Sequence, residues 1–457
     1  MEKLSFQDAS FLRMESEQRP FHVAGLMIFK PPENASPNFM RKLTRHCGRL
    51  NELWPVFAKK LKDPSSLRNP AWVTADDYDS KYHVHHYALP APGRMEDLLT
   101  LVSRVHERIL DRSRPLWELH LIEGLPGGRF ALYCKVHHAL VDGVGALRMI
   151  NALFTESPDK RINFRSAAPI ARAHHEKLSL SKQLGSASRE LKKHYAALPQ
   201  VGSLLVSMGR DAWIGKRDVP PLPFTAPRTL FNGDVDARRQ IIITELPLKR
   251  VRELAHAHGG TVNDVLVAIC GGAIREYLCE HDALPAKSLE AGVPVSIKHE
   301  GEQGGNQVCF VICPFFTEVR DPVQRIRKVI KVMNQAKDNI RNMSVTAAQD
   351  YTNIFMMPTI LLTMAGKTSQ VTPAFNAIVS NVPGSKHRLY LDGAAMEHMY
   401  PLSVVTDGIG INVTVVSYMG KLCFAITSCP TEQPGIGDIG RLIKKHYKAL
   451  QDATAGL

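Results

Sequence analysis

Two adjacent histidines, followed after three residues by Asp142 and Gly143, form the segment with the clearest potential for chemistry. They occur in VHHALVDG, residues 136–143. A histidine is the usual side chain for proton transfer near neutral pH, provided that its ring is held in place and meets the substrate. An aspartate four residues after His138 can brace the loop or the ring, and glycine allows a tight turn. The segment is a candidate general-base site acting on a hydroxyl, amine or thiol.

The same residues also have a purely structural interpretation. A histidine pair can pack at a strand end, and Asp142 followed by Gly143 is an ordinary helix-start signal. A second pair, His174 and His175, has Ser179 where the aspartate would stand, and we assign it to the surface. On the histidine pair alone, the structural interpretation is the stronger one.

The elements that must position the candidate base are two strands and a helix. Residues 116–122 alternate in polarity and are separated by the turn GLPGGR from the apolar run 130–136, which predicts a β-hairpin. Residues 145–154 have apolar side chains at helical spacing, and residues 22–29 predict a further buried strand. The histidines therefore lie at a strand–loop–helix junction.

A polar, basic stretch separates this region from a second half that again mixes strands and helices. Residues 157–230 predict a long crossover linker that includes a helix over 182–198, whereas the proline cluster at 219–227 cannot be helical. The predicted domains are residues 1–156 and 231–457. The predicted elements of the second half are strands at 239–246, 376–381, 410–418 and 422–427 and helices at 248–258, 261–278 and 436–452. The fold class is α/β or α+β.

Composition limits the class of partner. The 457 residues are 44% hydrophobic and 22% charged, as in ordinary globular proteins, and the formal net charge is +13. This charge favours phosphate-bearing ligands or an anionic membrane. Aromatics are only 7% and form no basic-aromatic array, which argues against nucleic acid. The eight cysteines form no CxxC and no metal-type cluster, so we expect a reduced, cytoplasmic protein that needs no metal.

The most apolar stretch is residues 354–366, IFMMPTILLTMAG. It is too short to span a bilayer. We predict a buried helix, with the wall of a lipid pocket as the functional alternative, since methionine and leucine line both. A separate observation concerns targeting. The first twenty residues contain acidic side chains and no long apolar run, so no signal peptide is expected.

The stretch HHALVDG matches HHxxxDG, the active-site motif of the CoA-dependent acyltransferase superfamily. The rest of the chain resembles one branch closely, the bacterial wax ester synthase/diacylglycerol acyltransferase family. Ser385 is a small departure, because the family more often has proline there. The supporting segments are LSFQDASFL (4–12), RPFHVAGL (19–26), DRSRPLW (111–117), TVNDVLVA (261–268), VPVSIK (293–298), GNQV (305–308) and SNVPG (380–384).

This resemblance implies two chloramphenicol acetyltransferase-like domains with mixed sheets flanked by helices, and an active site in a tunnel between them. It implies transfer of a fatty acyl group from acyl-CoA to a long-chain alcohol, giving a wax ester, or to diacylglycerol, giving triacylglycerol. Acyl-CoA would be a substrate, so no cofactor is expected. A basic chain without a spanning segment suits peripheral association with a membrane or lipid inclusions.

In this interpretation His138 is the general base that takes the proton from the acceptor alcohol. The alcohol is the nucleophile, so no acyl-enzyme is needed. His137 points the other way in an extended strand and shapes the site. Asp142 is a structural brace, and Gly143 is a requirement of the backbone.

The second half supplies further candidates. Thr261 and Asp264 have the spacing of a helix capping box, which places Asn263 in the first helical turn, where its amide can meet a developing oxyanion. Asp264 remains a candidate substrate contact, as does Trp117, although core packing suits that tryptophan better. Ser380, Asn381, Pro383 and Gly384 predict a strand followed by a turn with proline and glycine at its centre. The resemblance suggests that they contact the tunnel.

Two other functions fit parts of the pattern. Condensation domains, which join carrier-bound thioesters, share the histidine motif, but this chain has no room for the usual neighbouring modules. A non-catalytic lipid- or CoA-binding protein is the second alternative, and the intact HHxxxDG motif argues against it. Activity with free acyl-CoA and alcohol, without a carrier protein, separates these functions.

Overall fold

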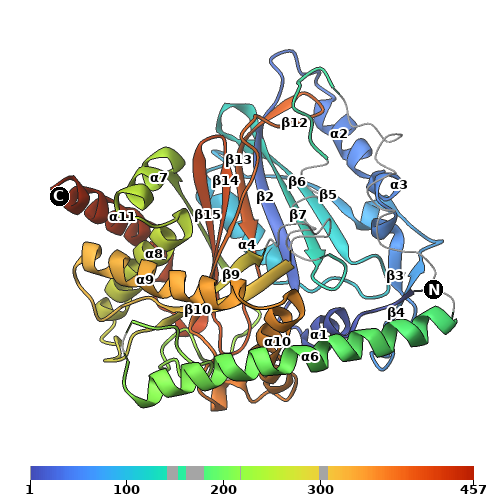
Figure 1. Ribbon diagram of the computed structural model, residues 1–457. Coiled ribbons are helices and arrows are strands. Elements are labelled where there is room, and N and C mark those ends of the chain that lie inside the picture. The colour runs from blue at the N-terminus through green and yellow to red at the C-terminus, as the bar shows by residue number, and fades with distance from the viewer. Residues whose placement is uncertain (1, 142–152, 161–179, 217, 298–306, 457) are drawn as a thin grey trace.

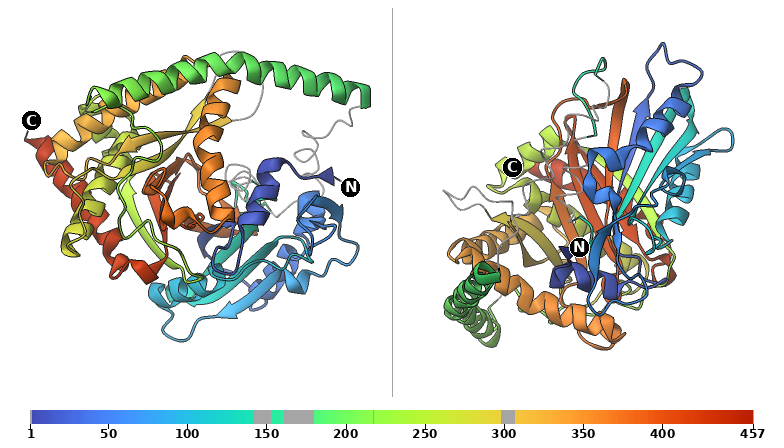
Figure 2. Two further views of the ribbon diagram at one scale, coloured as in Figure 1. Left: turned by 90° about the horizontal axis from the view of Figure 1, so that it is seen from below. Right: turned by 90° about the vertical axis from the view of Figure 1, so that its right-hand side faces the viewer.

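The computed structural model describes residues 2–141, 153–160, 180–216, 218–297 and 307–456. Two six-stranded sheets stand side by side, one built mainly from each half of the chain, and helices flank both (Figures 1 and 2). This arrangement confirms the predicted mixed α/β class with two sheet-rich halves.

The first sheet has the strand order β12-β13-β2-β7-β6-β5. Its strands are β2 (His22–Lys30), β5 (Val84–Ala88), β6 (Trp117–Leu125), β7 (Arg129–His137), β12 (Tyr390–Leu391) and β13 (Ala394–Leu402). Strands β6 and β7 form the predicted hairpin around Pro126–Gly128, and β2 is the predicted strand at 22–29. Only β5 pairs in parallel within this sheet.

Two strands of the first sheet come from the second half of the chain. β13 pairs antiparallel with β2, so that Leu402 lies opposite Ala24 and Ala395 opposite Lys30. The predicted division into contiguous domains at 1–156 and 231–457 did not include this exchange. Local pattern predicts whether a segment is a strand, but not which distant strand it will join.

The second sheet has the order β10-β9-β11-β14-β15-β8, with β11 parallel to both of its neighbours. Its strands are β8 (Gln240–Pro247), β9 (Glu290–Ile297), β10 (Gln307–Pro314), β11 (Ala377–Val382), β14 (Ile411–Tyr418) and β15 (Lys421–Ser428). All four strands predicted in this half are confirmed. The tight turn between β14 and β15 uses Gly420, whose φ of 76° suits glycine.

Helices complete the layers. In the second half, α7 (Leu248–Ala257), α8 (Val262–Glu280) and α11 (Ile439–Ala455) confirm the three predicted helices, and α9 (Pro322–Arg341) and α10 (Val345–Met364) follow β10. The first half contributes α1 (Phe6–Met14), α2 (Phe39–Cys47), α3 (Leu50–Leu53), α4 (Met95–His106) and a small sheet of β1 (Glu2–Lys3), β4 (Ala71–Thr74) and β3 (Lys59–Leu61).

The described part of the linker is dominated by one long helix, α6 (Leu180–Trp213), along the lower edge of the molecule in Figure 1. The predicted helix at 182–198 is therefore confirmed, but it continues through Pro199. Proline removes one backbone donor and usually breaks a helix. Here Ala197, Val201 and Met208 are buried in the core of the second half, and this packing stabilises the continuation. Residues 219–227 are irregular, as predicted.

The apolar segment at 354–366 is helical but not buried. It forms the C-terminal part of α10, and Ile354, Leu361 and Met364 are 43%, 55% and 43% exposed. The prediction of a buried helix is wrong, because α10 packs with one side only and its other side faces outward. No helix in the described residues is long and apolar enough to cross a membrane.

Candidate active site

His138 follows the last residue of β7, at the strand end where a base was predicted. Its backbone N–H donates to the carbonyl of Phe21 at 2.9 Å. Its half-buried ring lies against Phe11 of α1, with 4.3 Å between ring centroids and a tilt of 42°. Strand pairing thus holds the backbone while the ring stays partly exposed, as a general base requires. Asp142 and Gly143 lie outside the described residues, as do His174, His175 and Ser179.

His137 is completely buried, and its ring contacts Glu15, whereas the ring of His138 contacts Phe11. Its Nδ1 accepts the backbone N–H of Ala139 at 3.0 Å, so the ring is the neutral tautomer with its proton on Nε2. That Nε2 lies 3.3 Å from Oε1 of Glu15, a contact longer and less well aligned than a good hydrogen bond. His137 therefore braces the turn that carries His138.

Glu15 and Arg112 belong to this site, although sequence reasoning missed both. The carboxylate of Glu15 is fully buried and accepts the backbone N–H of Phe21 at 3.2 Å on Oε1. Its Oε2 accepts two N–H groups of Arg112, at 3.1 and 3.2 Å. Burial raises the pKa of Glu15, but His137, Phe21 and Arg112 outweigh it, and the net shift is downward. The carboxylate is therefore ionised at neutral pH.

Asn263 and Asn381, both predicted site residues, are brought together although they come from α8 and β11. Oδ1 of Asn263 accepts from Nδ2 of Asn381 at 2.7 Å. Nδ2 of Asn263 donates to no side chain among the described residues, which leaves it as a donor for a ligand. Among the hydrogen bonds of the described residues, none joins either asparagine to His138.

Asp264 has a structural role, which corrects its assignment as a substrate contact. Its Oδ2 accepts the backbone N–H of Thr261 at 2.7 Å, so the predicted capping box is confirmed. Its Oδ1 is 3.1 Å from Nζ of Lys337. The side chain has no exposed surface, and the helix start and this ion pair account for its contacts.

Trp117 is likewise a core residue, which corrects its assignment as substrate-binding. The side chain is completely buried in β6, and its Nε1 donates to the carbonyl of Phe57 at 2.9 Å. Its ring stacks between Phe57 and His83, each with a centroid 4.7 Å away. The alternation of side chains along the strand, which predicted core packing for Trp117, therefore gave the correct location.

Within the segment from Ser380 to Gly384, β11 ends at Val382, and the two residues that follow do not form the predicted turn. Ser380 lies in β11 opposite Thr414. Pro383 and Gly384 continue past the end of β11 and run alongside β14, where the Gly384 N–H donates to Oγ of Ser417 at 3.1 Å. A Cβ on Gly384 would come within 2.2 Å of the Ser417 carbonyl oxygen. The glycine is needed for this close approach and not for a turn, because its φ is not positive.

One group in the described residues has the composition of a metal site. Ligand atoms of His85, Glu118 and His120, on β5 and β6, all lie within 4.8 Å of one another. Oε2 of Glu118 is already 3.2 Å from Nε2 of His120 and 3.1 Å from Nζ of the buried Lys135. Burial raises the pKa of Glu118, but these partners outweigh it and lower the pKa to about 2. A metal would compete with a cation that this carboxylate already holds.

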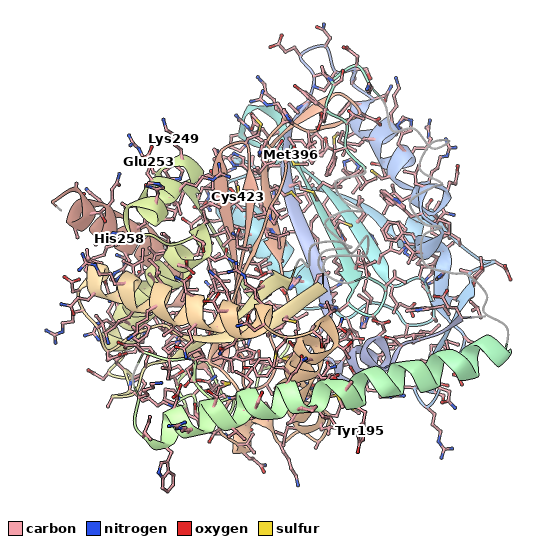
Figure 3. All side chains as sticks on the ribbon, viewed as in Figure 1. Tyr195, Lys249, Glu253, His258, Met396 and Cys423 are labelled. Carbon is pink, nitrogen blue, oxygen red and sulfur yellow. The ribbon has the colours of Figure 1, made fainter. Side chains whose placement is uncertain are left out.

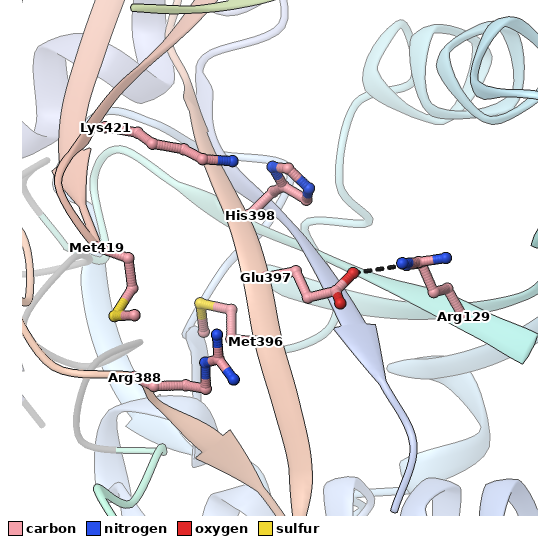
Figure 4. A pocket seen from close by; sticks show the side chains of 7 residues that line it. All are labelled: Arg129, Arg388, Met396, Glu397, His398, Met419 and Lys421. Atoms are coloured by element: carbon pink, nitrogen blue, oxygen red, sulfur yellow. Dashed lines mark hydrogen bonds and ion pairs between the residues drawn. The ribbon is translucent and has the colours of Figure 1, made fainter. Parts of the chain in front are cut away.

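A surface pocket of about 330 Å³ lies at the other end of β7 from the candidate base. Figure 4 shows the side chains that line it. The pocket includes Arg129, the first residue of β7, whereas His138 follows the last residue of that strand. The lining residues are Arg129, Arg388, Met396, Glu397, His398, Met419 and Lys421. The pocket takes no part in the site described above.

Comparison with known proteins decides the family. Residues 4–266 match the catalytic domain of wax ester synthase/diacylglycerol acyltransferase, and residues 304–451 match the C-terminal domain of the same proteins. The chain belongs to this family. The resemblance stated from the motifs is confirmed, and the protein is an acyltransferase enzyme.

Similar proteins cover the whole chain. A probable diacylglycerol O-acyltransferase of Mycobacterium tuberculosis is 36% identical over 99% of this chain and 100% of its own length. The O-acyltransferase WSD of Acinetobacter baylyi is 33% identical over 98% of this chain and 96% of its own. The solved wax ester synthase/diacylglycerol acyltransferase of Marinobacter aquaeolei superimposes with a TM-score of 0.78, at 31% identity and full coverage of both chains.

The starter condensation domain of rhizomide synthetase has the same fold at 13% identity and a TM-score of 0.59, over 99% of this chain and 95% of that one. This likeness extends to the fold alone. The family and this condensation domain therefore have a common architecture.

Proposed function

We propose that this acyltransferase moves a fatty acyl group from acyl-CoA to the hydroxyl of a long-chain alcohol, and that diacylglycerol serves as a further acceptor. The observation that carries the proposal is the position of His138. Its backbone is hydrogen-bonded to Phe21, its ring is partly exposed, and Phe11 supplies an apolar wall beside it. An apolar wall next to a proton acceptor suits the hydroxyl end of a lipid.

The reaction that this arrangement supports is a direct transfer. His138 accepts the proton of the acceptor hydroxyl as its oxygen attacks the thioester carbonyl carbon. The tetrahedral intermediate collapses by breaking the carbon–sulfur bond, and the CoA thiolate takes the proton from the imidazolium. The ester and free CoA are the products, and no group on the protein is acylated. We assign the donor for the oxyanion to Nδ2 of Asn263, at the start of α8.

We further propose that the enzyme docks on a lipid surface through α6 and α10. Tyr195, Leu198, Val206 and Trp213 lie on one side of α6 by helical spacing and are 77%, 53%, 73% and 91% exposed. Figure 3 shows Tyr195 on the outer side of this helix. Exposed apolar side chains in a continuous stripe, with a tryptophan, are typical of an interfacial helix.

α10 packs against α6 through buried side chains and exposes Ile354, Leu361 and Met364 to solvent. Tyr351 of α10 packs on Met208 of α6, with 3.8 Å between the hydroxyl and the sulfur. α10 also contacts α1, which carries Phe11 beside His138. The net charge of +13 adds attraction to an anionic surface. A lipid acceptor would thus reach the base from the side on which the protein docks.

A product assay tests the proposed reaction. Purified enzyme is given palmitoyl-CoA and an acceptor from a panel that runs from medium-chain alcohols to diacylglycerol, without metal or carrier protein, and the products are separated and weighed by mass spectrometry. We expect wax ester from alcohols and triacylglycerol from diacylglycerol. A strict requirement for zinc or for a carrier protein would overturn the proposal, and binding without ester formation would favour a non-catalytic lipid-binding protein.

A further inference from the structure

We infer that Glu15, held by Arg112, positions the general base from both sides of His138. This inference rests on the proposed function of His138 and extends it to a carboxylate that touches no reacting atom. Glu15 and Arg112 come from segments 97 residues apart and meet next to the catalytic motif.

The first connection runs through Phe21. Its N–H donates to Oε1 of Glu15 at 3.2 Å, and its carbonyl accepts the N–H of His138 at 2.9 Å. One peptide segment therefore links the carboxylate to the backbone of the base. A shift of the carboxylate would therefore move Phe21, the residue whose carbonyl holds the backbone of His138.

The second connection runs through His137. Its Nε2, 3.3 Å from Oε1 of Glu15, carries the proton, and its Nδ1 accepts the N–H of Ala139 at 3.0 Å. The carboxylate selects this tautomer, because the opposite one would turn a lone pair toward the anion and an N–H toward the Ala139 donor. Ala139 directly follows His138, so the base is fixed on its C-terminal side as well.

Arg112 makes a buried anion at this position tolerable. Two of its N–H groups reach Oε2 of Glu15, and one of its nitrogens also donates to the Leu12 carbonyl at 2.9 Å. A buried carboxylate without such a partner is strongly destabilising. The contact with Leu12 also ties the pair to α1, the helix that presents Phe11 to the ring of His138.

The arrangement explains why a histidine precedes the base. An imidazole offers one acceptor and one donor on opposite sides of a rigid ring. It therefore spans the distance between the Ala139 N–H and the Glu15 carboxylate in one fixed orientation. The second histidine does the chemistry, and the first transmits the position of Glu15 to it.

Replacing Glu15 by glutamine tests the inference, since glutamine keeps the shape and removes the charge. For Glu15→Gln we expect kcat to fall roughly 10- to 100-fold with little change in KM, as for a misplaced catalytic group. Loss of a nearby negative charge disfavours the imidazolium, so the acidic limb of the kcat/KM profile should move to lower pH. The matched control is Glu17→Gln, an exposed glutamate two residues away, which should leave both unchanged.

Nitrogen-15 NMR of the histidine rings provides a readout that does not depend on activity. The His137 signal, identified by its loss in His137→Gln, should show the Nε2–H tautomer in the unmodified enzyme and a mixture in Glu15→Gln. If Glu15→Gln does not fold, Arg112→Lys gives the same test with the charge kept and the paired hydrogen bonds lost. A folded Glu15→Gln enzyme with unchanged kcat, pH profile and tautomer would overturn the inference. An unmodified enzyme without acyl transfer but with the expected tautomer would overturn the proposed function alone.

Discussion

At the scale of single residues, the pairing of Asn263 with Asn381 makes a specific prediction about the oxyanion. Asn263→Ala removes the proposed donor, and loss of one such donor costs roughly 10² to 10³ in kcat. Asn381→Ala keeps the donor but removes the group that orients it through the 2.7 Å hydrogen bond, so its effect should be smaller.

Thermal melts and kcat on the same purified variants separate this role from a structural one. The matched control is Asp264→Asn, which should lower stability because it weakens the capping box and the ion pair with Lys337. An Asn263→Ala protein that melts at a lower temperature and keeps its kcat would exclude the oxyanion role.

Residues with a local signal are the ones that sequence can predict. His138 stands at a strand end, and Thr261 and Asp264 have capping-box spacing, so these were placed correctly. Trp117 shows the limit, since alternation put it in the core while the resemblance suggested a substrate. Glu15 and Arg112 have no local signal, because their roles come from contacts made only after the chain folds. Arg112 lies within the segment 111–117 that carried the resemblance, and Glu15 follows the segment 4–12 by three residues, but neither position indicates the contact between them.

At the scale of elements, the start of β9 holds an acid that destabilises the fold at high pH. Burial raises the pKa of Glu290 to about 7, and its Oε2 has no hydrogen-bond partner among the described residues. Between its ordinary value of 4.5 and about 7, the folded chain binds more protons at this group than the unfolded chain. The free energy of unfolding therefore falls as the pH rises through this window.

Glu290→Gln should remove this dependence. We expect the variant to gain on the order of 1 kcal/mol over the unmodified protein at pH 8, and much less at pH 5, where Glu290 is already mostly protonated. Urea melts at both pH values measure the difference, and Glu253→Gln on the exposed side of α7 serves as the control. Equal gains at pH 5 and pH 8 would contradict the assignment.

The sequence predicts helices and strands whose polarity pattern is strongly periodic, but it does not predict which strands pair with one another. The hairpin of β6 and β7 and the helix α8 were predicted because their patterns are local. The entry of β13 into the first sheet was not, because strand partners are chosen by long-range packing. α6 passes through Pro199 for a similar reason, since its apolar side is buried against the second half of the chain.

At the scale of the whole molecule, docking through α6 and α10 predicts how the enzyme partitions between water and lipid. Trp213→Ser with Val206→Ser should reduce binding to vesicles that contain anionic phospholipid, because both side chains are more than 70% exposed and lie on the same side of α6. Activity on a short, water-soluble alcohol should stay unchanged. Vesicle flotation measures the binding.

The control for docking is Met419→Ser, which removes an exposed apolar side chain from the turn between β14 and β15. Binding should weaken with salt, since the attraction of a basic chain to an anionic surface is screened. The apolar contribution of α6 is not screened, so part of the binding should persist in high salt. Equal binding by the double variant would exclude α6 as the docking element.

The most direct test of the central claim, that His138 is the base of an acyl transfer to an alcohol, is the rate of free CoA release from palmitoyl-CoA. The unmodified enzyme and His138→Ala are compared with and without hexadecanol, after circular dichroism has shown that both are folded. The account predicts release by the unmodified enzyme only when hexadecanol is present, and a rate roughly 10² to 10⁴ lower for His138→Ala. A folded His138→Ala enzyme that keeps the full rate would contradict it.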